Sequence, residues 1–138
     1  MKTRDAGFAL RSGLVTMAVI VVALAIIATQ LPKAFSDDLS RIGRGTQTAV
    51  LIHNKNGVES LKLMSVVDEV RHEFAGRLEF LIADVETDQG RSFMRQQQLG
   101  DIALVLFAAD GTRVGVVDPS LDERQLRAAL AGFVAAPR

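Results

Sequence analysis

The chain has 138 residues, a formal net charge of zero and no cysteine. Without cysteine it forms no disulfide, carries no thiolate nucleophile and offers no cysteine ligand to a metal. Its basic residues form no block, and it has no tryptophan or tyrosine for base stacking, which argues against a nucleic-acid partner. This length fits one globular domain with an appended segment.

The first element in chain order is a long apolar segment. No charged residue occurs between Arg11 and Lys33. As a helix, residues 13–31 would be about 28 Å long, which is close to the thickness of the hydrocarbon core of a bilayer. We therefore predict a single transmembrane helix over residues 13–32, preceded by a cytoplasmic tail over residues 1–12.

The apolar segment also predicts a location. A short basic tail before an apolar run is typical of an uncleaved export signal. We expect a single-pass protein of a bacterial-type inner membrane, with its N-terminus in the cytoplasm and its domain in the periplasm. The alternative is a signal peptide cleaved after residues 23–25, which would release a periplasmic protein but would split a continuous apolar run. Small residues that would let a partner's membrane helix pack closely are Gly13, Ala18 and Ala25.

A polar segment with two glycines, residues 33–46, is interpreted as a linker to a globular domain over residues 47–138. The domain begins with a continuously apolar strand over residues 48–53, expected to be buried on both faces. An amphipathic helix follows and ends before Gly76. Its predicted buried face consists of Val58, Leu61, Met64, Val67, Val70 and Phe74.

The next elements complete a sheet. Residues 78–84 form a second apolar strand, and a strand, helix and strand in this order predict a right-handed unit with parallel strands. A short polar helix is expected over residues 89–98. Residues 102–107 form a third buried strand, and the turn at residues 109–111 returns the chain into a fourth strand over residues 112–117.

A helix closes the domain. Ser120 and Glu123 match a capping box, which marks its start. The element order βαβαββα predicts an α/β domain with a four-stranded mixed sheet and helices on both faces. The predicted buried face of the closing helix consists of Leu121, Leu126, Ala129, Leu130 and Phe133.

This order and its local sequence resemble the thioredoxin-like fold family over Thr46 to Ala136. The family's Trp-Cys-x-x-Cys turn falls on residues 56–60, where both sulfurs are missing. The family's cis-proline, which precedes the third core strand, falls near Asp101 and Ile102. The likeness is carried by Val67–Val70, Phe74–Leu78, Leu81–Val85, Val105–Gly111 and Arg124–Arg127.

The resemblance implies a thioredoxin-like fold that does not perform dithiol exchange, because this reaction needs a thiolate and the chain has no cysteine. We expect a membrane-anchored, redox-inactive interaction module, an accessory, assembly or chaperone-like subunit of a larger membrane complex. Its expected partners are membrane proteins and the lipid bilayer, and no catalytic residue, cofactor or metal is predicted. The predicted partner-binding residues surround the turn that replaces the redox site: Asn54, Lys55, Asn56, Gly57, Glu59 and Asp101.

A second hypothesis belongs to a different class. A periplasmic enzyme or ligand-binding domain could use the same rim, with His53, Glu59 and Asp101 as its polar groups. Alone, His53 could ligate a metal or transfer a proton, but a histidine that merely ends a strand is the simpler interpretation. This hypothesis requires at least two of the three side chains to converge on one pocket.

Two other groups of residues suggest chemistry less strongly. Asp84, Glu86 and Asp88 alternate along a strand end and a loop, yet they lack the glycine-centred loop of a calcium site. We interpret them as a solvated acidic loop. Ser60 has no histidine near it in the sequence and is not expected to be a nucleophile.

Overall fold

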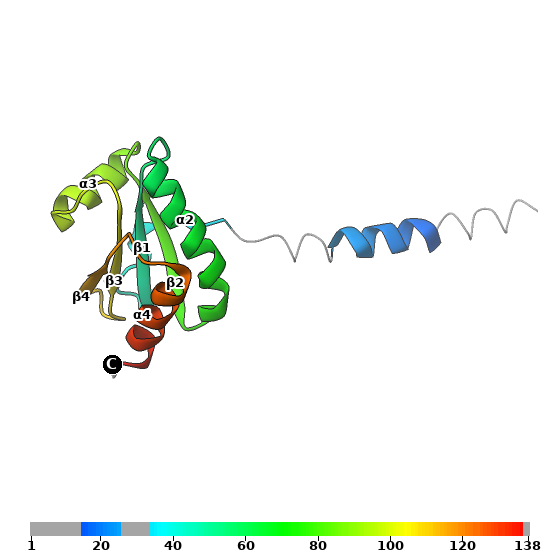
Figure 1. Ribbon diagram of the computed structural model, residues 1–138. Coiled ribbons are helices and arrows are strands. Elements are labelled where there is room, and N and C mark those ends of the chain that lie inside the picture. Colours follow the sequence, from blue (N-terminus) through cyan, green and yellow to red (C-terminus); the bar gives the residue numbers. More distant parts are fainter. Residues whose placement is uncertain (1–14, 26–33, 137–138) are drawn as a thin grey trace, which may run out of the picture. The chain divides into compact units, whose positions relative to one another are not determined.

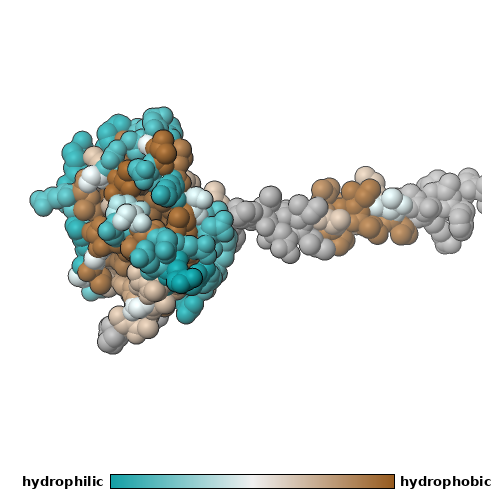
Figure 2. Space-filling view, viewed as in Figure 1, coloured by the Kyte–Doolittle hydropathy of each residue, from teal (hydrophilic) through white to brown (hydrophobic). Residues whose placement is uncertain are grey.

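The computed structural model describes residues 15–25 and 34–136. The chain divides into two compact units, Met1–Ala34 and Phe35–Arg138. In the first unit, residues 15–25 are helical, and Figure 2 shows this helix as mainly hydrophobic. No helix within the described residues is both long enough and apolar enough to span a membrane. The predicted transmembrane segment, residues 13–32, lies partly outside the described residues.

The second unit is built on a four-stranded sheet in the order β2-β1-β3-β4 (Figure 1). Strand β1 pairs in parallel with β2 and antiparallel with β3, and β4 pairs antiparallel with β3. The predicted four-stranded mixed sheet is confirmed, and its first and third strands are neighbours. The strands are β1 (Gln47–His53), β2 (Leu78–Asp84), β3 (Ala103–Phe107) and β4 (Arg113–Val117).

Helices cover both faces of the sheet, as predicted. Helices α2 and α4 pack on one face, and α3 packs on the other, together with residues that follow Phe35 (Figure 1). The helices are α2 (Val58–Arg71), α3 (Asp88–Gln97) and α4 (Glu123–Ala135), with short 3-10 helices η1 (Leu39–Arg41) and η2 (His72–Phe74).

Strand β1 lies in the middle of the core and is buried along its whole length. Ala49 and Leu51 point toward α2 and α4, whereas Val50 and Ile52 point toward α3. Because successive side chains of a strand alternate between faces, His53 continues the row of Ala49 and Leu51. Its side chain is therefore directed to the side of the sheet that α2 covers.

The N-terminal part of α2 buries different residues from those predicted. Val58 is 78% exposed and Leu61 is 49% exposed, whereas Ser60 and Leu63 are buried. From Val67 onward the buried residues are those expected. The predicted residues Val58 and Leu61 and the buried residues Ser60 and Leu63 both fit the three-to-four-residue spacing of a helix face. Because Ser60 is polar, the pattern of apolar residues favoured the wrong face.

The prediction of a linker over residues 33–46 is wrong from Phe35 onward, because this segment packs on the domain. The Arg71 guanidinium lies 4.3 Å from the centroid of the Phe35 ring. Ser36 forms a parallel bridge with β2, and its carbonyl accepts the N–H of Ile82 at 2.9 Å. The Phe35 ring, the backbone bridge at Ser36 and the apolar side chains of Leu39 and Ile42 therefore anchor a segment whose composition is that of a linker.

Helix α4 begins later than the predicted capping box of Ser120 and Glu123. Its N-cap is Asp122, whose carboxylate accepts the N–H of Gln125 at 2.8 Å. The Gln125 side chain in turn accepts the N–H of Asp122. The prediction of a capped helix was correct, but the box lies two residues further along. Within the helix, Ala129 is exposed rather than buried.

An exposed ion pair connects α4 to η2. Arg127 donates hydrogen bonds from Nε and Nη2 to the Glu73 carboxylate at 2.8–2.9 Å. These hydrogen bonds lower the pKa of Glu73 from its ordinary value of 4.5. Because folding lowers this pKa, the contribution to stability is complete above the unfolded value and is lost as the pH falls through the folded value.

We therefore expect Glu73→Gln to destabilise the protein slightly at neutral pH, and the difference from wild type to disappear as the pH falls through the lowered pKa of Glu73. Urea unfolding at a series of pH values measures it. Glu59→Gln is the matched control, because Glu59 forms no ion pair with another described residue. A difference that stays constant between pH 7 and 3 would show that Glu73 stabilises the fold by some other means than its charge.

Candidate functional site

The turn between β1 and α2 is closed by the backbone and side chain of Asn54. Its carbonyl accepts the N–H of Gly57 at 2.9 Å, and its side-chain oxygen accepts the N–H of Asn56 at 3.0 Å. An asparagine that bonds to the backbone two residues later is a recurrent way to stabilise a turn. Gly57 then serves as the N-cap of α2 without a side-chain hydrogen bond.

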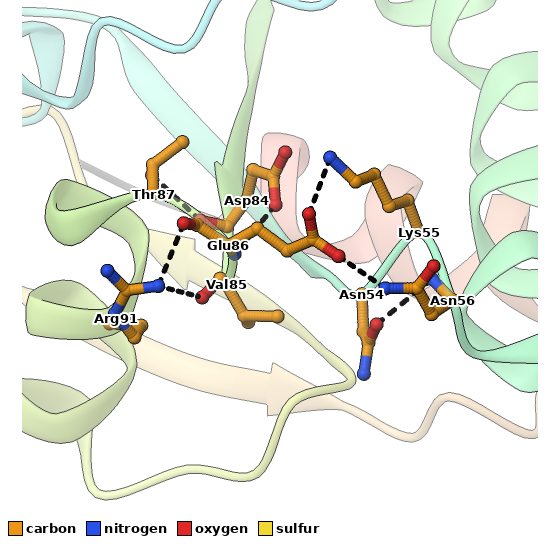
Figure 3. Close-up of polar contacts among 8 residues, drawn as sticks. All are labelled: Asn54, Lys55, Asn56, Asp84, Val85, Glu86, Thr87 and Arg91. Atoms are coloured by element: carbon orange, nitrogen blue, oxygen red, sulfur yellow. Dashed lines mark hydrogen bonds and ion pairs between the residues drawn. The ribbon is translucent and has the colours of Figure 1, made fainter.

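Acidic side chains from two other segments hold the turn in place, and Figure 3 shows the contacts of one of them, Glu86. The Lys55 ammonium lies 2.6 Å from one oxygen of Glu86, and the Asn56 amide donates a hydrogen bond to the other. The hydrogen bond to Glu86 raises the pKa of Lys55. The Asn54 amide donates to Asp101 at 2.8 Å. Three consecutive side chains are thus fixed from outside the turn.

The loop that carries Glu86 is itself fastened to α3 (Figure 3). The Arg91 guanidinium donates to the carbonyl of Glu86 at 2.8 Å, and the N–H of Glu86 donates to Asp84 at 2.8 Å. Thr87 caps α3 by accepting the N–H of Gly90 at 3.0 Å. The acidic residues are therefore engaged in structural contacts, and no described group of three acidic or histidine side chains could hold a metal.

Beneath the turn, Ser60 and His53 form a buried pair. The Ser60 hydroxyl oxygen lies 2.8 Å from His53 Nδ1 and also accepts the N–H of Asn54 at 2.8 Å. The hydroxyl donates to Nδ1 or accepts from it according to the imidazole tautomer, and the two side chains are bonded in either case. Ser60 is fully buried and His53 is 6% exposed. The pair links the end of β1 to the first turn of α2.

This pair does not form an accessible nucleophile. A catalytic serine must reach its substrate, whereas the Ser60 hydroxyl is enclosed and has its hydrogen-bonding capacity used internally. The sequence analysis considered His53 and Ser60 separately and missed their contact. The alternation of side chains along β1 could have predicted this contact. His53 lies on the same face of the sheet as Leu51, and the helix that contains Ser60 covers that face.

The structure brings together most, but not all, of the predicted partner-binding residues. Asn54 contacts Asp101, and Lys55 and Asn56 share Glu86, a residue that the sequence analysis did not include in the site. Glu59 is exposed on α2 and makes no hydrogen bond or ion pair with another described residue. Of the alternative trio, His53 bonds to Ser60 in the interior and Asp101 bonds to Asn54 at the rim, and neither bonds to the other.

Of the predicted membrane-packing residues, Ala18 and Ala25 lie in the helix of residues 15–25, and Gly13 lies outside the described residues. Ala18 contributes to a shallow apolar hollow along this helix. The hollow is lined by Val15, Ala18, Val19, Val22 and Ala23.

Comparison with solved structures places this strand–turn–helix in a known architecture. A thioredoxin from Thermus thermophilus matches with a TM-score of 0.63 and 15% identity, over 76% of this chain and 89% of that one. The chain has a thioredoxin-like fold. A second structure, described as that of a malarial protein, matches with a TM-score of 0.55 and 15% identity, over 66% of this chain and 99% of that one. No protein-family model and no curated protein matches the sequence.

Proposed function

We propose that this chain is a membrane-anchored thioredoxin-like module that binds a membrane protein partner and performs no dithiol exchange. The partner contacts the turn Asn54–Gly57 together with Glu59 and Asp101. The chain acts as an accessory, assembly or chaperone-like subunit, and residues 13–32 hold it in a bacterial-type inner membrane with the domain in the periplasm.

The observation that carries this proposal is the network around the turn. Lys55 is about half exposed and Asp101 is exposed, so their side chains are accessible to a partner, while hydrogen bonds and an ion pair fix their positions. Side chains that are already ordered lose less conformational entropy on binding. A polar turn held in one arrangement is thus suited to recognition.

Two further observations support a binding role. Ser60 is fully buried at the position that the resemblance assigns to the second cysteine, and the chain contains no sulfur for exchange at that position. Next to the turn, Val58 and Leu61 are exposed on α2. Apolar side chains bordered by fixed polar groups are typical of protein–protein interfaces.

The anchor rests on the sequence and on the described part of the first unit. No charge interrupts the run between Arg11 and Lys33. The helix of residues 15–25 exposes valine, isoleucine, leucine and methionine side chains, which a bilayer would cover. Its hollow beside Ala18 would accommodate a neighbouring membrane helix.

Site-specific photo-cross-linking in native membranes tests the binding site. With the cross-linker at Lys55, we expect one dominant product that contains a membrane protein. With the cross-linker at Glu69, which is exposed on the same helix about 17 Å beyond its start, we expect little of that product. Equal yields at both positions, or no protein product from Lys55, would contradict the proposal.

A further inference from the structure

Strand β4 is an edge strand whose outer side has no partner. It pairs with β3 on one side, and no other described strand pairs with it (Figure 1). Val114 and Val116 on this strand are 58% and 41% exposed. An uncovered edge offers a row of N–H and C=O groups to another strand.

Gly115, in the middle of β4, is not explained by the domain alone. A Cβ built at this position would meet nothing within 4 Å, and the backbone has no positive φ that would require glycine. Glycine inside a strand weakens it, and it often marks a place where another backbone comes close. The residue therefore points to an approaching chain.

The charges at the two ends of β4 favour a particular approaching chain. Arg113 begins the strand and Asp118 follows its last residue, so the ends carry opposite charges. Antiparallel pairing of two identical copies centred on Val116 would place Asp118 of each copy opposite Val114 of the other, one position from Arg113, so that the opposite charges lie near each other. Such self-complementarity is what an interface with twofold symmetry requires.

We propose that the β4 edges of two copies of this chain pair antiparallel about Val116 and join their sheets into one. This register keeps paired residues on the same face of the sheet. Gly115 pairs with Leu106 and Val117 with Leu104, both on the face covered by α2 and α4, so Gly115 of one copy lies opposite Val117 of the other.

The surroundings of the edge fit this pairing. A bulge interrupts the β3–β4 ladder near Arg113, but Gly115–Val117 pair regularly with β3 and remain available for a second strand. On the α4 side, a cavity of about 270 Å³ lies beside Val114. In the proposed register, Asp118 and Pro119 of the second copy run past Val114 and cover this apolar groove.

Disulfide trapping of the full chain in detergent tests the pairing, and the absence of native cysteine makes every introduced thiol unique. Residues directly opposed in antiparallel strands have Cα atoms about 4.5–5.5 Å apart, within the range of a disulfide. Val116→Cys should cross-link about tenfold faster than Val58→Cys, an exposed control, because a preformed interface raises the effective concentration. Equal rates would overturn the proposal.

Charge reversal gives a second, independent test in the Val116→Cys background. Arg113→Glu and Asp118→Lys should each slow cross-linking, and the two together should restore it. Arg113 also bonds to the carbonyl of Gln97, and Asp118 bonds to Ser120. If the single substitutions slowed cross-linking only because they break these local contacts, the combined variant would be slower than either single one. Recovery supports antiparallel pairing, and a combined variant slower than either single one overturns it.

Discussion

Gly90→Ala will destabilise the domain by about 3 kcal/mol, although alanine is the better helix former. A Cβ at this position of α3 would lie 1.9 Å from the carbonyl oxygen of Asp84 and 2.5 Å from its carbonyl carbon. Both atoms belong to the backbone at the end of β2, so no side-chain rotation relieves the overlap. The helix must move away from the sheet.

Gly132→Ala is the matched control and should have the opposite sign. Gly132 is also inside a helix, but a Cβ there meets nothing within 4 Å. Removing the conformational freedom of that glycine should stabilise the domain by up to about 1 kcal/mol. Urea unfolding of both variants measures the contrast. A midpoint for Gly90→Ala at or above that of the wild type would show that α3 does not pack as closely on β2 as described.

The same substitution has a consequence for the proposed binding site. Thr87 and Arg91 in the first turn of α3 support the loop that carries Glu86, and Glu86 holds Lys55 and Asn56. Displacing α3 should therefore loosen the turn as well as destabilise the domain. Gly90→Ala should reduce cross-linking from position 55 even at temperatures where the domain stays folded.

Ser60→Ala will cost about 2–3 kcal/mol of stability, because it leaves a buried imidazole and a partly buried N–H without their partner. The hydroxyl accepts the N–H of Asn54 and bonds to Nδ1 of His53, both at 2.8 Å. The imidazole has little access to water that could replace the hydroxyl, since Ser60 is fully buried and His53 is 6% exposed. Chemical denaturation of the variant gives the loss directly.

Ser65→Ala provides the control for this prediction, as Ser65 is exposed on the same helix. Alanine there should be neutral or stabilise by about 0.5 kcal/mol. A double-mutant cycle of Ser60→Ala with His53→Leu should give a coupling energy of about 1 kcal/mol or more. A coupling energy near zero would mean that the hydroxyl and the imidazole do not stabilise each other.

The sequence predicts the sheet well because its strands are short, apolar and separated by clear turn signals. Continuous burial of β1 and the hairpin at Gly111 follow directly from residue types, and Gly111 indeed has a φ of +88°. The linker and the start of α2 were predicted less well for one shared reason. Phe35 and Ser60 are single residues whose burial depends on contacts with another element: Phe35 contacts Arg71 of α2, and Ser60 contacts His53 at the end of β1.

The candidate site shows the same division between local and distant information. The turn at Asn54–Gly57 was predicted from its own residues, which form its internal hydrogen bonds. Glu86 was interpreted only as part of a solvated loop, because no local pattern connects it with Lys55, which lies 31 positions earlier. Only the parallel pairing of β1 and β2, which sets His53 beside Asp84, brings the two loops together.

Native mass spectrometry of the full chain, extracted from its own membranes in mild detergent, tests the binding role most directly. The account predicts a complex with a membrane protein in fixed stoichiometry, in which the chain retains residues 13–32. It also predicts that reversing the charge of Lys55, by Lys55→Glu, releases much of that partner. Recovery of the chain alone, or only of paired copies of itself, would contradict the proposed function. The pairing of β4 edges is tested separately, by disulfide trapping at Val116.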